Sequence, residues 1–598
     1  MLFSPALYAV DANPPSLHSE RGAWPITRQW TLEETRHFAE WVHHIYEKKS
    51  GGSREERVAK LERILTDPQM NLLLDPGFAG DGCNDQLDIG IICAMHRVVD
   101  CAKLTVAFST YYSYRRGLPW VIGRVRACDG GDVRTAACAI ATGEINSFEY
   151  DSAERFFRDA VTDTCTGNFR VELTGAGPGL SDTLPVALSR EYLIPGCMYY
   201  VDGHVSILAE VTPYGAPRFL DATVAASRDV YAHNGFNAVN GMTPKRSGAR
   251  GQEYAGCFRG FRVYRWPVAE VNEGGVVSRV RRRSDEEMRA FGYSSEQYDR
   301  IEELIATQRI MENAVPIDSY HQFLRLRLRS NDRVDPAAEL RQFADEMVAS
   351  CEEREQRVQE GWREVNENGP VGFPEDSDQG NVFTAGGRWG EYASALADTA
   401  WRAKYFELAD EIDNAIAWFD RNAEEVNAEA LQMHGIWSHA DLAYAVLRAK
   451  ERIFGGAAFE YKNSAGASVR LTLLEVEKRM YDLSFDPNHP PELRWGAPPG
   501  SLEAQTCPSR STLLPGGGAM AMEEAYRREA YYRSRMHWEP DPSYLREMFT
   551  EGYPVLDKLD QRLRQRWFDG SSPPLVPRTG KAAWQKELAQ RRSPGAAE

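Results

Sequence analysis

Three residues that could act together on an amide bond occur along the chain in the order Cys101, His204 and Asp221. Cys101 begins a predicted helix that runs to Arg116 and is capped by Gly117. A thiol at the N-terminus of a helix lies at the positive end of the helix dipole, which favours the thiolate. The pattern therefore offers a nucleophile at position 101.

Residues 195–223 favour three short antiparallel strands, separated by an Asp-Gly turn and a Pro/Gly turn. His204 begins the second strand and Asp221 ends the third, so their side chains can meet on one sheet. The alternation of side chains along 205–210 predicts that the second strand is half-buried. An aspartate bonded to a histidine fixes the tautomer of the ring and stabilises the imidazolium. With His204 beside it as a base, Cys101 would be an activated nucleophile.

Two stretches of the chain carry a family resemblance. HVSILAEVTPYGAPRFLDAT, which begins at His204, resembles the His-to-Asp segment of transglutaminase-like proteins, in which the pattern H-x-W-x-E-V…W…L-D-x-T is usual. DCAKLTVAFSTYYSYRRGLPW, which begins at Asp100, resembles the cysteine-bearing block of uncharacterised bacterial proteins of this kind. Over roughly a third of its length, the chain is thus similar to the papain-like/transglutaminase-like cysteine hydrolase superfamily.

This resemblance implies an α+β fold with a papain/transglutaminase-like core, in which the helix bearing Cys101 packs on a small antiparallel sheet. It also implies a catalytic triad of Cys101, His204 and Asp221 that acts on peptides, isopeptides or cell-wall stem peptides. Two positions differ from the usual pattern. Ser206 stands where an aromatic residue is usual, and Lys103 stands where an acidic residue is common.

Other residues compete for roles in this site. Cys83, in the stretch GDGCNDQ, also precedes a predicted helix, at about 85–98, and is the alternative nucleophile. Tyr114 and Trp120 follow Cys101 in an aromatic-rich stretch, and we expect them as candidates for the rim of a substrate groove. No GxGxxG or P-loop pattern occurs, and no histidine or cysteine spacing is typical of a metal site, so we expect neither a cofactor nor a metal.

Changes in pattern divide the chain into four predicted segments. They are an N-terminal helical segment (1–75), a transglutaminase-like/papain-like α+β core (76–270), a large α-helical region (271–570) and a flexible tail (571–598). In the first segment, helices are predicted at 31–50 and 54–65, with a Gly-Gly break between them. In the third, apolar residues at three- and four-residue steps predict long helices at 335–366, 389–422, 424–453, 470–482 and 521–567.

Composition limits the classes of function. The 598 residues carry 70 basic and 87 acidic side chains, a formal charge of −17, which argues against a nucleic-acid partner. No stretch approaches the 18 apolar residues of a membrane span. Ten cysteines are too few for a disulfide scaffold, and none lies in a CxxC pair. The apolar N-terminus lacks the basic region of a secretion signal. We expect a cytoplasmic protein, or an envelope or secreted one if a signal is truncated.

The leading hypothesis is a bacterial cysteine hydrolase or acyltransferase that forms an acyl-thioester at Cys101. Intact Cys, His and Asp positions favour this hypothesis. The alternative is an inactive transglutaminase-like scaffold that binds a protein partner. The absence of an identifiable oxyanion donor and of the usual aromatic residue, replaced by Ser206, favours it. Neither the substrate nor the oligomeric state follows from the sequence.

Overall fold

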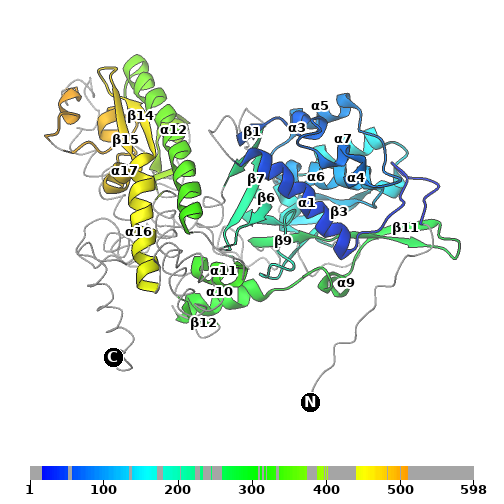
Figure 1. The fold of residues 1–598 in the computed structure, drawn as a ribbon. Helices are drawn as coiled ribbons and strands as arrows, with labels where there is room; N and C mark the ends of the chain where they lie inside the picture. Colours follow the sequence, from blue (N-terminus) through cyan, green and yellow to red (C-terminus); the bar gives the residue numbers. More distant parts are fainter. Residues whose placement is uncertain are drawn as a thin grey trace.

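The chain folds as a mixture of helices and antiparallel sheet, an α+β architecture (Figure 1). This computed structural model describes residues 17–508, except for the segments 51–56, 129, 134–135, 137, 172–179, 202–203, 214, 223–228, 234–243, 245–258, 308–309, 313–314, 318–319, 331–335, 373–386, 396, 399–400, 402–438, 481–482 and 499. The predicted tail at 571–598 and the predicted helix at 521–567 lie outside these residues.

A seven-stranded sheet forms the centre of the first part of the molecule, and every pair of neighbouring strands in it is antiparallel. In spatial order its strands are β1 (Val58–Ala59), β8 (Val230–His233), β7 (Pro217–Ala222), β6 (His204–Val211), β5 (Met198–Val201), β9 (Gly260–Tyr264) and β4 (Thr183–Pro185). The meander expected within 195–223 is therefore present as β5, β6 and β7. Strand β6 is the middle strand of the sheet, and helices that pack on the sheet contact this strand.

Both faces of β6 are buried, which differs from the predicted half-buried strand. Along this strand Val205 and Ile207 are buried, and so are the intervening Ser206 and Leu208. The alternating pattern predicted one solvated face, but the helices α1 (Leu32–Lys49) and α6 (Cys101–Arg116) both pack against the strand. A polar residue such as Ser206 is thus held in the core, where it needs a hydrogen-bond partner.

The N-terminal segment belongs to the same hydrophobic core as the sheet. Trp30 of this segment stacks on Trp266, with ring centroids 4.1 Å apart, and Trp41 of α1 packs on Phe108 of α6. The predicted cap of α1 is present, because the side chain of Thr31 accepts a hydrogen bond from the backbone N–H of Glu34. The helix predicted at 54–65 is wrong in part. Strand β1 pairs with β8 there, and α3 (Leu61–Thr66) begins only after it.

Short elements connect α1 to the sheet and extend the first part of the molecule. These are η1 (Leu72–Leu74), α4 (Pro76–Ala79), α5 (Ile89–Val98), β2 (Val121–Ala127), β3 (Ala139–Asn146), η2 (Ser147–Glu149), α7 (Ala153–Asp163) and η3 (Thr166–Arg170). Helices α5 and α7 pack together, and α5 also packs against α3 and α7 against α6. The helix α6 is thus enclosed between the sheet and these outer helices.

The region predicted to be helical, 271–570, also contains two-stranded antiparallel hairpins. They are formed by β10 (Pro267–Val271) with β11 (Val277–Arg282), β12 (Ile310–Glu312) with β13 (Val315–Ile317), and β14 (Ala458–Lys462) with β15 (Ser468–Thr472). The helices described between and after them are α9 (Asp285–Arg289), α10 (Glu296–Thr307), α11 (Tyr320–Leu328), α12 (Pro336–Asn368), α13 (Gly387–Tyr392), α16 (His439–Gly456), α17 (Leu473–Arg479), α18 (Pro491–Arg494) and η5 (Ala504–Thr506). Hairpins this short give too weak an alternating pattern to be predicted.

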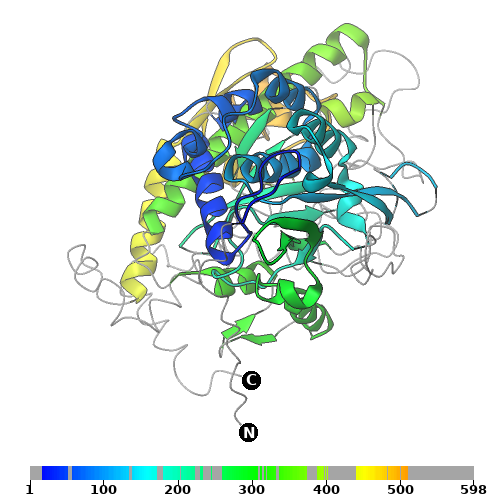
Figure 2. The same ribbon diagram turned by 90° about the vertical axis from the view of Figure 1, so that its right-hand side faces the viewer.

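Two long helices, α12 and α16, lie side by side and dominate the later part of the chain (Figure 2). The guanidinium of Arg354, on α12, donates to both carboxylate oxygens of Asp398, at 2.8 and 3.1 Å, and to the backbone O of Ser484. All three residues are buried. The loop that contains Ser484 is therefore held to α12 by a buried hydrogen bond from Arg354.

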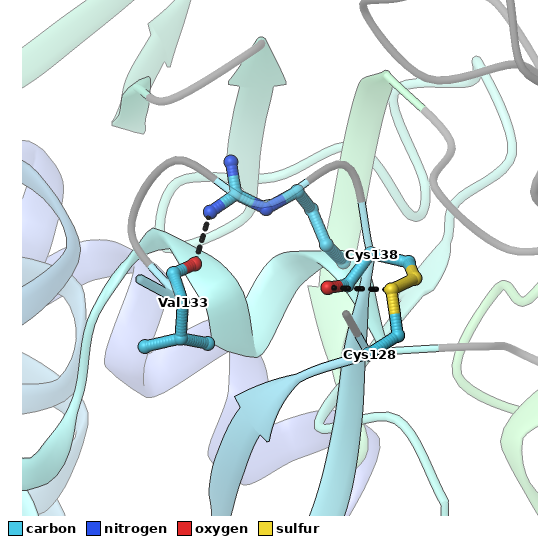
Figure 3. Close-up of a disulfide and its surroundings, with 4 residues drawn as sticks. Cys128, Val133 and Cys138 are labelled. Atoms are coloured by element: carbon cyan, nitrogen blue, oxygen red, sulfur yellow. Dashed lines mark hydrogen bonds between the residues drawn. A yellow bond between two sulfur atoms is a disulfide. The ribbon is translucent and has the colours of Figure 1, made fainter. Parts of the chain in front are cut away.

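A disulfide between Cys128 and Cys138 joins β2 and β3 at the base of the loop that connects them (Figure 3). The two Cα atoms are 5.7 Å apart, because the cysteines directly follow β2 and directly precede β3. Within the enclosed loop, the backbone O of Val133 accepts a hydrogen bond from Arg170 at 2.6 Å. The sequence predicts that the chain is not a disulfide scaffold, and a single bridge within one hairpin agrees with this prediction. Seven other cysteines are free in the described ranges.

Removing this bridge is expected to lower the free energy of unfolding by about 2–3 kcal/mol, because the unfolded chain is released from a ten-residue loop. Urea unfolding of the Cys128→Ser/Cys138→Ser double variant measures the loss. The single variant Cys507→Ser, which changes a half-buried free thiol, is the control. If a reductant leaves the unfolding midpoint of the wild type unchanged, the bridge does not contribute as expected.

Candidate active site

Cys101 is the first residue of α6, and the residue before it holds the start of the helix. The carboxylate of Asp100 accepts a hydrogen bond from the backbone N–H of Lys103 at 2.9 Å. It also forms an ion pair with the Nζ of the same lysine at 2.7 Å. This explains the lysine at a position where an acidic residue is common, since it pairs with the capping carboxylate. Cys101 is 3% exposed, so its thiol faces the interior of the molecule.

His204 and Asp221 lie on neighbouring strands and bond to each other. The Nε2 of His204 is 2.6 Å from Oδ2 of Asp221. The register of the sheet causes this contact. Ile207 pairs with Leu220, so Ser206 lies opposite Asp221, and His204 lies two residues along the same face of β6. The hydroxyl of Ser206 donates to the same carboxylate oxygen at 2.7 Å.

Cys101, at the start of α6, approaches the imidazole of His204 from the helix that packs on β6. The thiol of Cys101 lies close enough to this imidazole to contribute to the raised pKa of the ring. Since Nε2 of the ring is occupied by Asp221, the nitrogen left for the sulfur is Nδ1. The structure thus brings together the three residues that the sequence singled out, with the imidazole between a thiol and a carboxylate.

The surroundings of His204 favour its charged form. Burial alone would lower the pKa of this imidazole, but the charge of Asp221 and the hydrogen bonds to Asp221 and Cys101 raise the pKa to about 11. The ring is therefore an imidazolium at neutral pH. A positive charge hydrogen-bonded to a sulfur stabilises the thiolate form of that sulfur.

This shifted pKa predicts how stability depends on pH. The histidine of an unfolded chain has a pKa near 6.5, so the extra stability due to the folded imidazolium is fully present below about pH 6.5. It is lost as the pH rises toward about 11. We expect the free energy of unfolding of the wild type minus that of His204→Gln to fall over this window. The slope is at most about 1.4 kcal/mol per pH unit, and less because a third of the side chain is solvent-screened. Urea unfolding between pH 6 and 10 measures it, and a constant difference would contradict it.

Ser206 is the functional residue that the sequence reasoning missed. The sequence pattern marks Ser206 only as a departure from the usual aromatic residue. In the structure its hydroxyl is buried and donates a hydrogen bond to the Oδ2 of Asp221. Its position two residues after His204 was the available signal, because residues i and i+2 of a strand share a face. Ser206 thus positions Asp221 for its contact with the imidazole.

Cys83, the alternative nucleophile, lies at the opposite end of α6 from His204. The backbone N–H of its neighbour Asn84 donates to the O of Arg115, near the last residue of the helix. A helix of 16 residues is about 24 Å long, so this end is far from Cys101. The helix after Cys83 also begins only at Ile89, with Asp88 as its cap. Cys83 is therefore neither at a helix start nor placed to react with His204.

The two candidates for a groove rim are also wrong in position. Trp120 is 1% exposed and packs edge-on against Tyr264, so it belongs to the aromatic core. Tyr114 lies 13 residues along α6 from Cys101, about 20 Å away, and packs against Phe157 of α7. The aromatic-rich stretch of sequence therefore builds the core and not a groove beside the nucleophile.

Within the described ranges, no group of three or more His, Cys, Asp or Glu side chains is close enough to hold a metal ion. Among the same residues, no helix combines the length and the apolar character needed to cross a bilayer. Comparison with known proteins gives no match, whether to a family model, to a curated protein or to a solved structure. The chemistry available to this protein is therefore set out from the geometry around Cys101.

Proposed function

We propose that this protein is a cysteine hydrolase or acyltransferase that cleaves an amide bond through an acyl-thioester on Cys101. The observation that carries the proposal is the position of one imidazole, that of His204, which is hydrogen-bonded to Asp221 and lies on the strand packed against the helix that begins with Cys101. A nucleophile, a proton carrier and an orienting carboxylate in this order are the parts that amide cleavage by a thiol needs.

The steps follow from the positions of these groups. The proton of the thiol rests on His204, and the Sγ of Cys101 attacks the carbonyl carbon of the substrate to form a C–S bond. His204 then gives its proton to the amide nitrogen as the C–N bond breaks, and the amine leaves. Water or a second amine attacks the thioester and gives its proton to His204. The C–S bond breaks, the acid or new amide is released, and the enzyme is restored.

The negative oxygen formed during the attack needs donors nearby. The first N–H groups of an α-helix have no acceptor within the helix, and Cys101 supplies the first of those of α6. Its backbone N–H, at the positive end of the helix dipole, is the donor that we assign to the oxyanion. Stabilisation of such an oxygen is commonly the largest single contribution to acyl transfer.

The proposal includes a papain/transglutaminase-like core. Support comes from the order of the parts: a helix that begins with the cysteine packs on an antiparallel sheet, and adjacent strands of the sheet carry the histidine and the aspartate. By analogy, the substrates are peptides, isopeptides or cell-wall stem peptides. The disulfide between Cys128 and Cys138 supports an oxidising compartment, such as the cell envelope or the exterior.

The experiment that tests this proposal is acylation by p-nitrophenyl acetate, followed by peptide mapping. We expect a burst of about one equivalent of nitrophenol per protein, with the acetyl group on Cys101, because acylation by an activated ester is faster than hydrolysis of the thioester. The Cys101→Ala variant should show no burst. Adding an amine distinguishes transfer from hydrolysis, since transfer gives the acetylated amine.

Other outcomes of this experiment are equally informative. A burst with acetyl on Cys83 would reject our choice of nucleophile. No acylation of any cysteine would favour the alternative function, an inactive scaffold that binds a protein partner. The buried position of Cys101 makes acylation at this residue a demanding test, because an unactivated buried thiol is inert.

A further inference from the structure

Helices α5 and α7 enclose a groove of about 270 Å³ on the outer side of α6. Its walls are largely apolar and are formed by Ile91, Met95 and Val98 of α5 and by Phe157 and Val161 of α7. Its polar members include Asp88, Glu154 and Arg158. A volume of this size is just below the usual range for small-molecule sites and accommodates one or two large side chains.

The direction of the groove follows from two contacts at the C-terminal end of α6. The backbone N–H of Asn84 donates to the O of Arg115 at 3.0 Å. Asn84 lies five residues before Ile89, so the segment that leads into α5 starts at this end of α6. Phe157, in the first half of α7, packs on Tyr114 at the same end. Helix α5 therefore runs antiparallel to α6, and its C-terminal end lies at the N-terminus of α6, where Cys101 begins the helix. The two helices can be followed next to each other in Figure 1.

The apolar end of the groove lies within reach of a substrate bound at Cys101. Val98, the last residue of α5, is three residues before Cys101, so their Cα atoms are at most about 11 Å apart. That distance corresponds to about three residues of an extended peptide. Val98 is 38% exposed and continues the apolar wall of the groove to this end.

Charge distinguishes the other end. Asp88 caps α5 and lies about 15 Å from Val98 along this ten-residue helix. Glu154 lies in the first turn of α7 and also lines the groove. The one basic side chain among the groove's charged residues, Arg158, already pairs with Asp159 at 3.5 Å. The far end of the groove therefore favours a positively charged group.

We infer that this groove binds the acyl-side segment of the substrate. The occupant is a peptide with large apolar side chains about three residues from the reacting carbonyl and a basic group several residues further away. The inference rests on the proposed function, because it takes Cys101 as the reacting group. It deepens that function by naming the class of substrate: an apolar peptide with a basic end.

The test compares the rates at which two peptide chloromethyl ketones alkylate Cys101. One is acetyl-Lys-Ala-Leu-Leu-Ala-Ala chloromethyl ketone, and the other has serines in place of both leucines. In each, the sulfur forms a C–S bond with the methylene carbon and chloride leaves. Every rate is divided by that of iodoacetamide with the same variant, which removes differences in thiol reactivity. We expect the leucine probe to react at least about ten times faster. Replacing its lysine by glutamate should slow it about threefold at low salt.

Matched variants locate the effect. Val98→Glu places a charge at the apolar end and should reduce the preference for leucine to less than about twofold. Val271→Glu makes the same change at an equally exposed valine outside the groove, on β10, and should leave the preference intact. Ala94→Lys is a second groove variant, at an exposed helical position that tolerates a long side chain. It should act like Val98→Glu.

The failures of the two proposals are distinguishable. If iodoacetamide does not select Cys101, the proposed function is wrong and the groove has no assigned role. If iodoacetamide selects Cys101 but the leucine probe shows no preference, the groove assignment alone is overturned. The same conclusion follows if the preference survives in both Val98→Glu and Ala94→Lys.

Discussion

Replacing His204 by alanine is expected to slow the alkylation of Cys101 by iodoacetamide at pH 6 by about 100-fold. An ordinary thiol, with a pKa near 8.5, is ionised to less than about 1% at this pH, and only the thiolate reacts. In the wild type, the imidazolium of His204, whose pKa is raised to about 11, lies beside the sulfur and stabilises its negative charge during the attack. Rates of labelling between pH 5 and 9, with peptide mapping, measure the effect.

The control for this prediction is His43→Ala. The Nδ1 of His43, on α1, bonds the backbone O of Ala209 on β6 at 3.0 Å, so this histidine contacts the same strand. Its loss should change the labelling rate by less than about twofold, because its imidazole contacts Ala209 and Glu47 while the imidazolium of His204 stays in place. Asp221→Asn should give a partial loss, since the ring then keeps a hydrogen-bond partner without a charge. Equal labelling of the wild type and His204→Ala at pH 6 would reject the activated pair.

Replacing Glu34 by alanine is expected to lower the free energy of unfolding by about 3–5 kcal/mol. Its carboxylate accepts two hydrogen bonds from Arg116, at 2.8 and 3.0 Å, and one from the hydroxyl of Tyr112 at 2.7 Å. The charged side chains of Glu34 and Arg116 are only about a tenth exposed. Removing the carboxylate leaves a buried guanidinium without its counter-charge, which is far more costly than losing an exposed pair. Urea unfolding of both proteins at pH 7 measures the difference.

The neighbouring variant Glu33→Ala is the matched control. Glu33 has the same charge and lies in the same first turn of α1, but it is exposed. Its replacement should change stability by no more than about 0.5–1 kcal/mol, the contribution of one charge at a helix terminus. If Glu33→Ala and Glu34→Ala destabilise the protein equally, the loss comes from the helix dipole and not from the buried ion pair between α1 and α6.

The elements that local sequence determines were predicted closely. The helix expected from Cys101 to Arg116 has those bounds, with Asp100 as its N-cap and Gly117 in the left-handed conformation at its C-cap. The helix predicted at 335–366 is present as α12, and the strands around His204 lie within a residue or two of their expected positions. Caps, turns and apolar periodicity act over a few residues, so they can be recognised without knowledge of the tertiary structure.

Elements that depend on distant partners were predicted less well. Strand β1 forms where a helix was expected, because its partner β8 lies more than 150 residues later in the chain. The bridge between Cys128 and Cys138 depends on the pairing of β2 with β3, and the burial of both faces of β6 depends on the helices around it. No local pattern carries information about such partners.

The sequence by itself determined which residue types are available for chemistry and which of them begin a helix or a strand. Only the tertiary structure decided their roles. It places the sulfur of Cys101 against His204, more than 100 residues away, and Cys83 at the far end of the helix. It also shows that Ser206 bonds Asp221 and that Trp120 is core. The physical reason is that reactivity depends on contacts between side chains, and the register and packing of whole elements set these contacts.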